Sequence, residues 1–260
     1  MVELTQLLLL GTFSGFVAGL LGVGGGLIMV PALLYLLSGD IIESALMHTA
    51  IGTSLAAIVF TSISSVWAHH RHNAVHWHNF NKLTPTILLG AFSGAILAKT
   101  LSFDFLRIFF ALFEITVALI MWFGISASGH IDHLAKWVWL ITGYVIGLVS
   151  AIVGIGGGTM TTPFLVYNNV NIKNAIATSA AVGMPIAIAG ALGFIVAGWG
   201  VESAIGGLGF IHIEALVSIV VASVLFAPLG AKVAHSVDGK KLKKGFALFL
   251  GLLGFLVMAF

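Results

Sequence analysis

The stretch GFVAGLLGVGGGLIMVPALLYLL, residues 15–37, decides the fold. It is almost wholly apolar, yet it contains three consecutive glycines, Gly24, Gly25 and Gly26, followed by Pro31. It belongs to a charge-free run from residue 4 to residue 39. As one straight helix this run would be about 54 Å long, far more than the roughly 30 Å core of a bilayer. Because glycine and proline disfavour helix interiors, we expect the run to break at the glycine triplet, giving helices near 4–21 and 26–38.

The composition of the whole chain is that of a membrane protein. Hydrophobic residues make up 59% of the chain and charged residues only 8%, against about 25% charged in a soluble domain. Six further charge-free runs follow the first, at 44–70, 83–98, 137–172, 174–201, 215–231 and 245–260. Runs of this length predict membrane-spanning helices rather than barrel strands. We therefore predict an all-α, polytopic membrane protein.

Several classes of function are excluded by the same numbers. The chain has no cysteine, so it forms no disulfide, thiolate metal site or cysteine nucleophile. Its net charge of +2 is small and scattered, and no nucleic-acid partner is expected. No phosphate-binding Walker sequence is present, so direct use of ATP is not expected. The first apolar run lacks a basic leader and is longer than a signal peptide's apolar region, so we expect it to remain in the membrane.

The glycine triplet recurs in the second half of the chain. At an offset of 132 residues, Gly24–Gly26 align with Gly156–Gly158, Pro31 aligns with Pro163, and Tyr35 aligns with Tyr167. HTAIGTSLAAI at 48–58 then matches SAAVGMPIAIA at 179–189 after a slip of one residue. The pattern predicts a tandem duplication: a first transmembrane repeat over 1–127, a linker at 128–133 within SASGHIDHLAK, and a second repeat over 134–260.

The number of crossings has two interpretations. Besides the broken helices, we expect helices near 44–68, 83–100, 105–124, 174–198, 212–234 and 242–260. This gives eight helical segments, or ten if each broken helix counts twice. The placement of Lys and Arg slightly favours ten. Ten crossings would make the halves inverted repeats with both termini outside, whereas eight would place the C-terminus inside.

A helix that begins inside the membrane presents unpaired N–H groups and the positive end of its dipole. Such groups are costly in hydrocarbon, so a polar partner is expected there, and an anion fits best. Other glycines have a simpler interpretation. The spacings of Gly11, Gly15 and Gly19, and of Gly90 and Gly94, are typical of close helix packing.

The doubled G-x-GGG-x-x-x-x-P motif, followed by HTAIGTS at 48–54 and ATSAAVG at 177–183, resembles the TauE/SafE sulfite exporter family over essentially the whole chain. The resemblance implies a secondary transporter of small sulfur-containing or organic anions, such as sulfite, thiosulfate or sulfoacetate, in a prokaryotic plasma (inner) membrane. Where the first half reads GTS the second reads GMP at 183–185, so the halves need not contribute equally. The substrate-binding residues that the resemblance implies are Gly24, Gly25, Gly26, Pro31, Thr49, Thr53, Ser54, Gly156, Gly157, Gly158, Pro163, Thr178 and Ser179.

Two ionisable residues in predicted spans are candidates for proton coupling or gating. Glu114 lies near the centre of the helix at 105–124, and the aligned residue of the second half, Leu250, is apolar. A carboxyl group that gains and loses a proton there would couple transport to a proton gradient, because charge inside a membrane is expensive. A neutral glutamic acid bonded to a neighbouring helix is the equal alternative. His48 directly precedes a segment with hydroxyl groups at Thr49, Thr53 and Ser54. Its alternative role is that of an imidazole at the membrane interface or bonded to a neighbouring helix.

The segment AHHRHNAVHWHNFNK at 68–82 carries five of the ten histidines. We predict a polar cytoplasmic connection there, since the spacing matches no compact metal signature and no carboxylate is present. The leading hypothesis is therefore an anion transporter that works by alternating access, without a cofactor or bound metal. The alternatives are an intramembrane metal-dependent enzyme using His48, His69, His70 and Glu114, or a passive anion channel.

Overall fold

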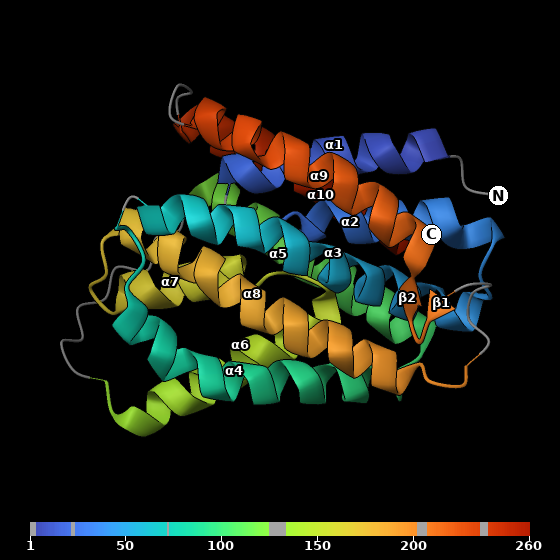
Figure 1. Cartoon of the computed structure of the whole chain (residues 1–260), viewed down its shortest axis with the longest axis horizontal. Helices are drawn as coiled ribbons and strands as arrows, with labels where there is room; N and C mark the ends of the chain where they lie inside the picture. Colours follow the sequence, from blue (N-terminus) through green and yellow to red (C-terminus); the bar gives the residue numbers. More distant parts are fainter. Residues whose placement is uncertain (1–3, 22–23, 72, 125–133, 202–206, 235–238) are drawn as a thin grey trace.

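A computed structural model describes residues 4–21, 24–71, 73–124, 134–201, 207–234 and 239–260 (Figure 1). Ten α-helices and one short two-stranded hairpin form the described part of the chain. In chain order the elements are α1 (Leu4–Leu21), α2 (Gly26–Leu36), a 3₁₀ turn (Leu37–Gly39), α3 (Glu43–Arg71), α4 (Trp77–Ala98), α5 (Phe103–Phe123), α6 (Lys136–Val153), α7 (Gly158–Tyr167), α8 (Ile172–Ala197), β1 (Gly207–Leu208), β2 (Ile211–His212), α9 (Ile213–Ala234) and α10 (Gly239–Ala259).

Both long apolar runs are broken at their glycine triplets, as predicted. The first run gives α1 and α2, and the second gives α6 and α7. The helical class and the count of ten helices are thus confirmed. The proposed linker at 128–133 lies outside the described residues. Five of the helices, α3, α5, α6, α8 and most of α9, are long and apolar enough to cross a membrane.

The two series of helices, α1–α5 and α6–α10, pack against each other throughout. Helix α1 packs along α9, and α4 packs along α6. Glycines make these approaches possible: a methyl group on Gly15 would lie 2.5 Å from the backbone of Ser223, and one on Gly94 would lie 2.6 Å from the carbonyl oxygen of Leu148. Gly11 and Gly90 make equally close backbone contacts. The packing role predicted for these four glycines is confirmed.

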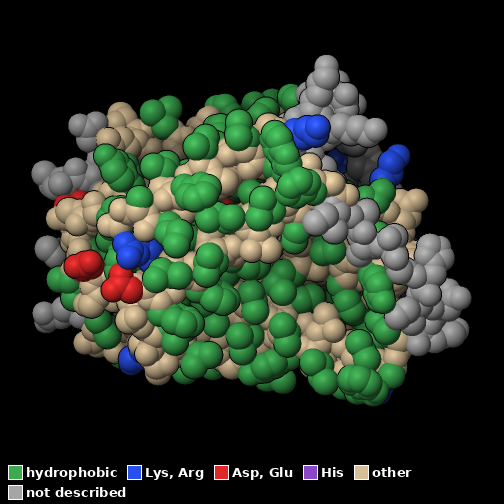
Figure 2. Space-filling model, turned by 180° about the vertical axis from the view of Figure 1, so that it is seen from behind, with side chains coloured by type: hydrophobic (Ala, Val, Ile, Leu, Met, Phe, Trp, Pro, Cys, Tyr) green, Lys and Arg blue, Asp and Glu red, His purple; other side chains and the backbone are tan. Residues whose placement is uncertain are grey.

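The centre of the bundle is formed by α3 and α8, which are the two most buried of the five long apolar helices. The outer helices α5 and α10 instead expose large apolar side chains, including Leu112 and Leu119 on α5 and Leu252 and Phe255 on α10. Hydrophobic side chains cover the middle of the face drawn in Figure 2, and charged side chains gather toward its two ends. This distribution suits a lipid-facing surface.

Two local expectations were wrong. The histidine-rich segment is mostly helical rather than a connection, since α3 continues to Arg71 and α4 begins at Trp77, six residues before the expected start. Polar residues at the end of a membrane helix are compatible with a helix that extends beyond hydrocarbon. The second surprise is the hairpin β1–β2 in a chain expected to be wholly helical. Gly209, with φ of 58°, supplies the left-handed turn that joins its strands.

Candidate functional site

The two short helices α2 and α7 begin in the same unusual way. Their N-cap residues, Gly25 and Gly157, have the left-handed φ values 76° and 71°. Each cap carbonyl accepts the first hydrogen bonds of its helix, from Met29 N at 3.1 Å and from Thr161 N at 2.9 Å. Glycine at the cap position has no side chain that could accept a hydrogen bond from the first N–H groups. Both helices therefore present bare amide donors and a positive dipole end inside the protein.

The glycine triplets lie against each other. A methyl group on Gly24 would lie 3.5 Å from Cα of Gly156, and one on Gly156 would lie 3.7 Å from Cα of Gly24. A methyl group on Gly26 would collide with the carbonyl oxygen of Gly154. All these residues except Gly24 are buried. Segments 132 residues apart in the sequence thus meet in the interior through backbone contact.

Three of the sequence-predicted hydroxyl residues bind backbone groups that are distant in the sequence. Ser54 in α3 donates its hydroxyl to the carbonyl oxygen of Gly154 at 3.0 Å, which ties α3 to the break between α6 and α7. Thr53 Oγ1 accepts the backbone N–H of His212 at 2.9 Å. Thr178 Oγ1 in α8 accepts the backbone N–H of His76 at the same distance. These threonines therefore hold connections between helices.

The other predicted residues are less uniform. Thr49 is fully buried, and its hydroxyl oxygen has no hydrogen-bond partner among the described residues. Ser179 pairs with Thr162 of α7 at 2.7 Å. Pro31 is buried in α2, whereas Pro163 is exposed on α7. The prolines thus occupy different environments despite their equal spacing from the triplets.

Sequence reasoning missed a group of hydroxyls around the start of α7. Ser150 of α6, and Thr159 and Thr161 of α7, have buried hydroxyl oxygens without a hydrogen-bond partner among the described residues. Ser150 Oγ lies 3.4 Å from the position that a Cβ atom would take on Gly157. A buried hydroxyl without a partner costs free energy. Comparing the two halves would have revealed this group, because the residues 132 positions earlier are Ala18, Leu27 and Met29.

The two ionisable candidates lie in different settings. His48 Nε2 is 2.9 Å from the carbonyl oxygen of Ala98, and its ring stacks on Phe210 with centroids 5.0 Å apart. Glu114 of α5 is fully buried, and neither carboxyl oxygen has a hydrogen-bond partner among the described residues. Among the described residues, no neighbouring helix supplies the hydrogen bond that the alternative interpretation of Glu114 requires.

The ligand set of the metal-enzyme alternative is not brought together. His48 and His69 lie on the same continuous helix, α3, and 21 residues of α-helix span about 31 Å. Within the described ranges, no group of three or more His, Asp or Glu side chains could hold a metal ion. The hypothesis that combined His48, His69, His70 and Glu114 in one site was wrong for this geometric reason.

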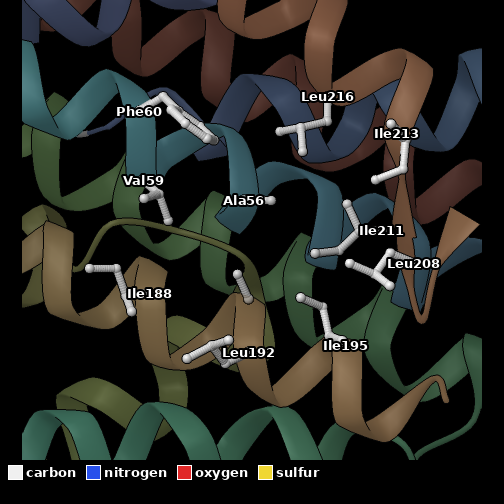
Figure 3. A pocket seen from close by; sticks show the side chains of 11 residues that line it. Ala56, Val59, Phe60, Ile188, Leu192, Ile195, Leu208, Ile211, Ile213 and Leu216 are labelled. Carbon is white, nitrogen blue, oxygen red and sulfur yellow. The ribbon is translucent and has the colours of Figure 1, made fainter.

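A separate cavity of about 270 Å³ lies between α3, α8, α9 and the hairpin. Its lining side chains are all apolar, and Figure 3 shows Phe60, Leu192 and Leu208 approaching it from three different elements. No charged or hydroxyl side chain lines it, so it does not suit an anion.

Comparison with known proteins assigns the family. The sequence profile described as Sulfite exporter TauE/SafE matches residues 7–257, nearly the whole chain. The chain belongs to the TauE/SafE family. A probable membrane transporter protein of Haemophilus influenzae is 40% identical over 246 residues, covering 94% of this chain and 93% of that protein. A probable membrane transporter protein of Methanocaldococcus jannaschii is 26% identical over 265 residues, covering 98% and 95%.

A third relative is the probable membrane transporter protein YdhB of Bacillus subtilis, 25% identical over 251 residues, with 94% of this chain and 96% of that protein covered. No solved structure matches the chain. Family membership and the apolar helices together make this a multi-pass membrane protein with bacterial and archaeal relatives, and a probable membrane transporter.

Proposed function

We propose that the protein is a secondary transporter that moves small sulfur oxyanions or related organic anions across a prokaryotic plasma membrane by alternating access. The observation that carries this proposal is the meeting of two glycine-capped helix starts, at Gly25 and Gly157, in the protein interior. Amide donors at a helix start bind anions without a permanent positive charge, so that the ligand can still leave. The family name supports sulfite or a similar anion as the substrate.

The order of the helices supports an inverted-repeat architecture. The lengths of α1 to α5 are 18, 11, 29, 22 and 21 residues, and those of α6 to α10 are 18, 10, 26, 22 and 21. We propose that the two series are repeats of five helices with opposite orientations in the membrane. Transporters with such repeats and broken helices bind their substrates near the bilayer midplane.

For coupling, we propose that Glu114 carries the transported proton. An ionised carboxylate without a partner in the protein interior costs several kcal/mol, so the group holds its proton until another conformation hydrates it. Helices α3, α6 and α10 pack against α5. The charged and titratable residues of these helices whose side chains the structure describes are Glu43, His48, His69, His70, Arg71, Lys136, Tyr144 and Lys244, and α5 itself carries Asp104 and Arg107, which pair at 3.0 Å. None of them is hydrogen-bonded to Glu114.

The test is uptake of radiolabelled sulfite, thiosulfate, sulfoacetate and carboxylates into proteoliposomes, with and without a pH gradient. We expect saturable uptake of at least one sulfur oxyanion, and faster uptake when the vesicles are preloaded with the same unlabelled anion. Uptake that rises linearly with concentration and shows no such counterflow would indicate a channel. Failure to move any anion of the panel would contradict the proposal.

A further inference from the structure

The starts of α2 and α7 differ in their chemistry, although their backbones are alike. At α2, the position of a Cβ atom on the cap residue Gly25 lies 3.4 Å from the Ala18 methyl group and 3.3 Å from Met29 Cε. At α7, the corresponding position on Gly157 is occupied by the Cδ1 methyl group of Ile186 and lies 3.4 Å from Ser150 Oγ. Ala18 and Ser150 are separated by 132 residues, the offset of the two triplets. The Ala18 methyl group at one helix start is thus replaced by the Ser150 hydroxyl at the other, where it lies beside Ile186.

The hydroxyl groups near the start of α7 make no hydrogen bond to any of the described residues. Ser150 and Thr161 are both fully buried, and their hydroxyl oxygens have no hydrogen-bond partner there. Buried hydroxyls are normally bonded, because leaving them unpaired costs on the order of 1–3 kcal/mol each. Other buried serines of the bundle follow this rule: Ser223 Oγ donates to the carbonyl oxygen of Val220 at 3.2 Å. The exceptions therefore point to a missing acceptor.

We propose that the start of α7 is the primary half-site, where Ser150 and Thr161 donate to an oxyanion that also accepts the first backbone N–H groups of the helix. This inference rests on the proposed function and deepens it by naming the half that binds. The ligand class is a small oxyanion with several acceptor oxygens, since every donor at this site is neutral and all can donate at once. The start of α2, lined by Ala18 and Met29, completes the enclosure without hydroxyl donors.

The concentration dependence of sulfite uptake by Ser150→Ala and Thr161→Val tests this half-site. Removing a hydroxyl that bonds a charged ligand raises KM about tenfold while the maximal rate stays within about twofold. Ser223→Ala is the matched control, because it removes an equally buried but bonded serine hydroxyl, and its KM is expected to be unchanged. An unchanged KM in both Ser150→Ala and Thr161→Val would overturn the half-site. Wild-type protein that transports no anion would instead overturn the proposed function.

A second inference comes from the two connections that precede α4 and α9. The backbone N–H of His76, directly before α4, donates to Thr178 of α8, and that of His212, directly before α9, donates to Thr53 of α3. Each connection is therefore fastened to a central helix of the other series by an N–H···Oγ1 bond, and Asn174 Nδ2 of α8 also donates to the carbonyl oxygen of Ala74 in the first connection at 2.9 Å. The two connections lie at opposite ends of the molecule (Figure 1).

Each connection also inserts an apolar side chain beside its threonine. Val75 is buried against Ala177 and Ala181 of α8. In the hairpin, Phe210 is 4% exposed and stacks on His48, and its N–H donates to the carbonyl oxygen of Phe194 at 3.2 Å. Leu208 and Ile211 of the hairpin line the apolar cavity, which leaves space on that side of the strands.

We infer that these two connections are the paired gates of alternating access, with Thr178 and Thr53 as their positioning residues. Opening the end at His76 requires release of its N–H···Oγ1 bond and of the Asn174–Ala74 bond, with withdrawal of Val75. Opening the hairpin end requires release of its N–H···Oγ1 bond and of the Phe210–Phe194 bond, with withdrawal of Phe210, while the bonds at the other end persist. This inference also rests on the proposed function. Its observations are independent of the half-site, because neither threonine hydroxyl lies in the unpartnered group around α7.

The natural absence of cysteine allows a direct test of the gates. A single reporter, Ala177→Cys, places a thiol under Val75, where Ala177 is fully buried. We expect Thr178→Val to raise the rate of its labelling by a small maleimide several-fold, because the nearer gate is released. Thr53→Val should lower that rate, because release of the far gate favours closure at the reporter.

Changes of opposite sign in the labelling rate distinguish gating from loosening of the fold, because loosening would raise the labelling rate in both variants. Any outcome other than opposite signs, measured on folded protein in lipid vesicles, would overturn the paired gates. Labelling does not require a transported anion. The gates and the anion assignment can therefore fail separately.

Discussion

Gly26→Ala is expected to reduce anion uptake at least tenfold. The added methyl group would collide with the carbonyl oxygen of Gly154 and would lie 3.0 Å from Cα of Ile155. Both neighbours are backbone, which cannot rotate away as a side chain can, and overpacking of this kind costs about 1–3 kcal/mol. The start of α2 would have to move away from the segment that leads into α7. The paired donors would then no longer face one anion.

The measurement is the initial rate of uptake in proteoliposomes that contain equal amounts of monodisperse protein. Gly39→Ala is the matched control, because a methyl group at that exposed glycine meets no atom within 4 Å. We expect its uptake to equal that of the wild type. Wild-type uptake by folded Gly26→Ala would show that the close approach of the two breaks is not needed for transport.

Glu114→Gln is expected to separate exchange from accumulation. Glutamine resembles the protonated carboxyl group in size and polarity but releases no proton. Exchange of internal for external anion should therefore continue within about twofold of the wild-type rate. Accumulation that an imposed pH gradient drives in the wild type should fall at least tenfold, because the variant gains no free energy from that gradient.

The two readouts are taken from the same vesicle preparation, with and without the gradient. Asp104→Asn is a suitable control, since Asp104 is an exposed carboxylate on the same helix that pairs with Arg107. That variant should keep its response to the gradient. If Glu114→Gln accumulates anion as the wild type does, Glu114 is a structural carboxyl group and the coupling proton travels elsewhere.

The sequence predicted most of the helices because their cause is local. Runs of apolar residues require helices in hydrocarbon, and the triplets at Gly24 and Gly156 break them through properties of glycine itself. The same holds for Gly15 and Gly94, whose spacing predicted close packing before the partners were known. The sequence pattern could not predict which helices pack together, such as α1 with α9, because these contacts join residues far apart in the chain.

The candidate site was predicted less completely than the fold. Thr53 and Thr178 were expected to bind substrate, and their contacts with the N–H groups of two distant connections were not predicted. A hydroxyl in a membrane helix looks the same in the sequence whether its partner is a ligand or the backbone. The hairpin was missed for a related reason: two strands of two residues give no periodic signal, and docking onto Phe194 holds them.

Crystallography with selenite, the heavier analogue of sulfite, shows whether the starts of α2 and α7 together hold an anion. Crystals of the protein with unlabelled methionine, grown with saturating selenite, should give an anomalous selenium peak at a position where the selenite oxygens accept hydrogen bonds from the backbone N–H group of Gly158 and from Ser150 Oγ. Sulfite in excess should remove the peak. A selenium peak elsewhere in the protein, in crystals of protein that transports selenite, would contradict the claim.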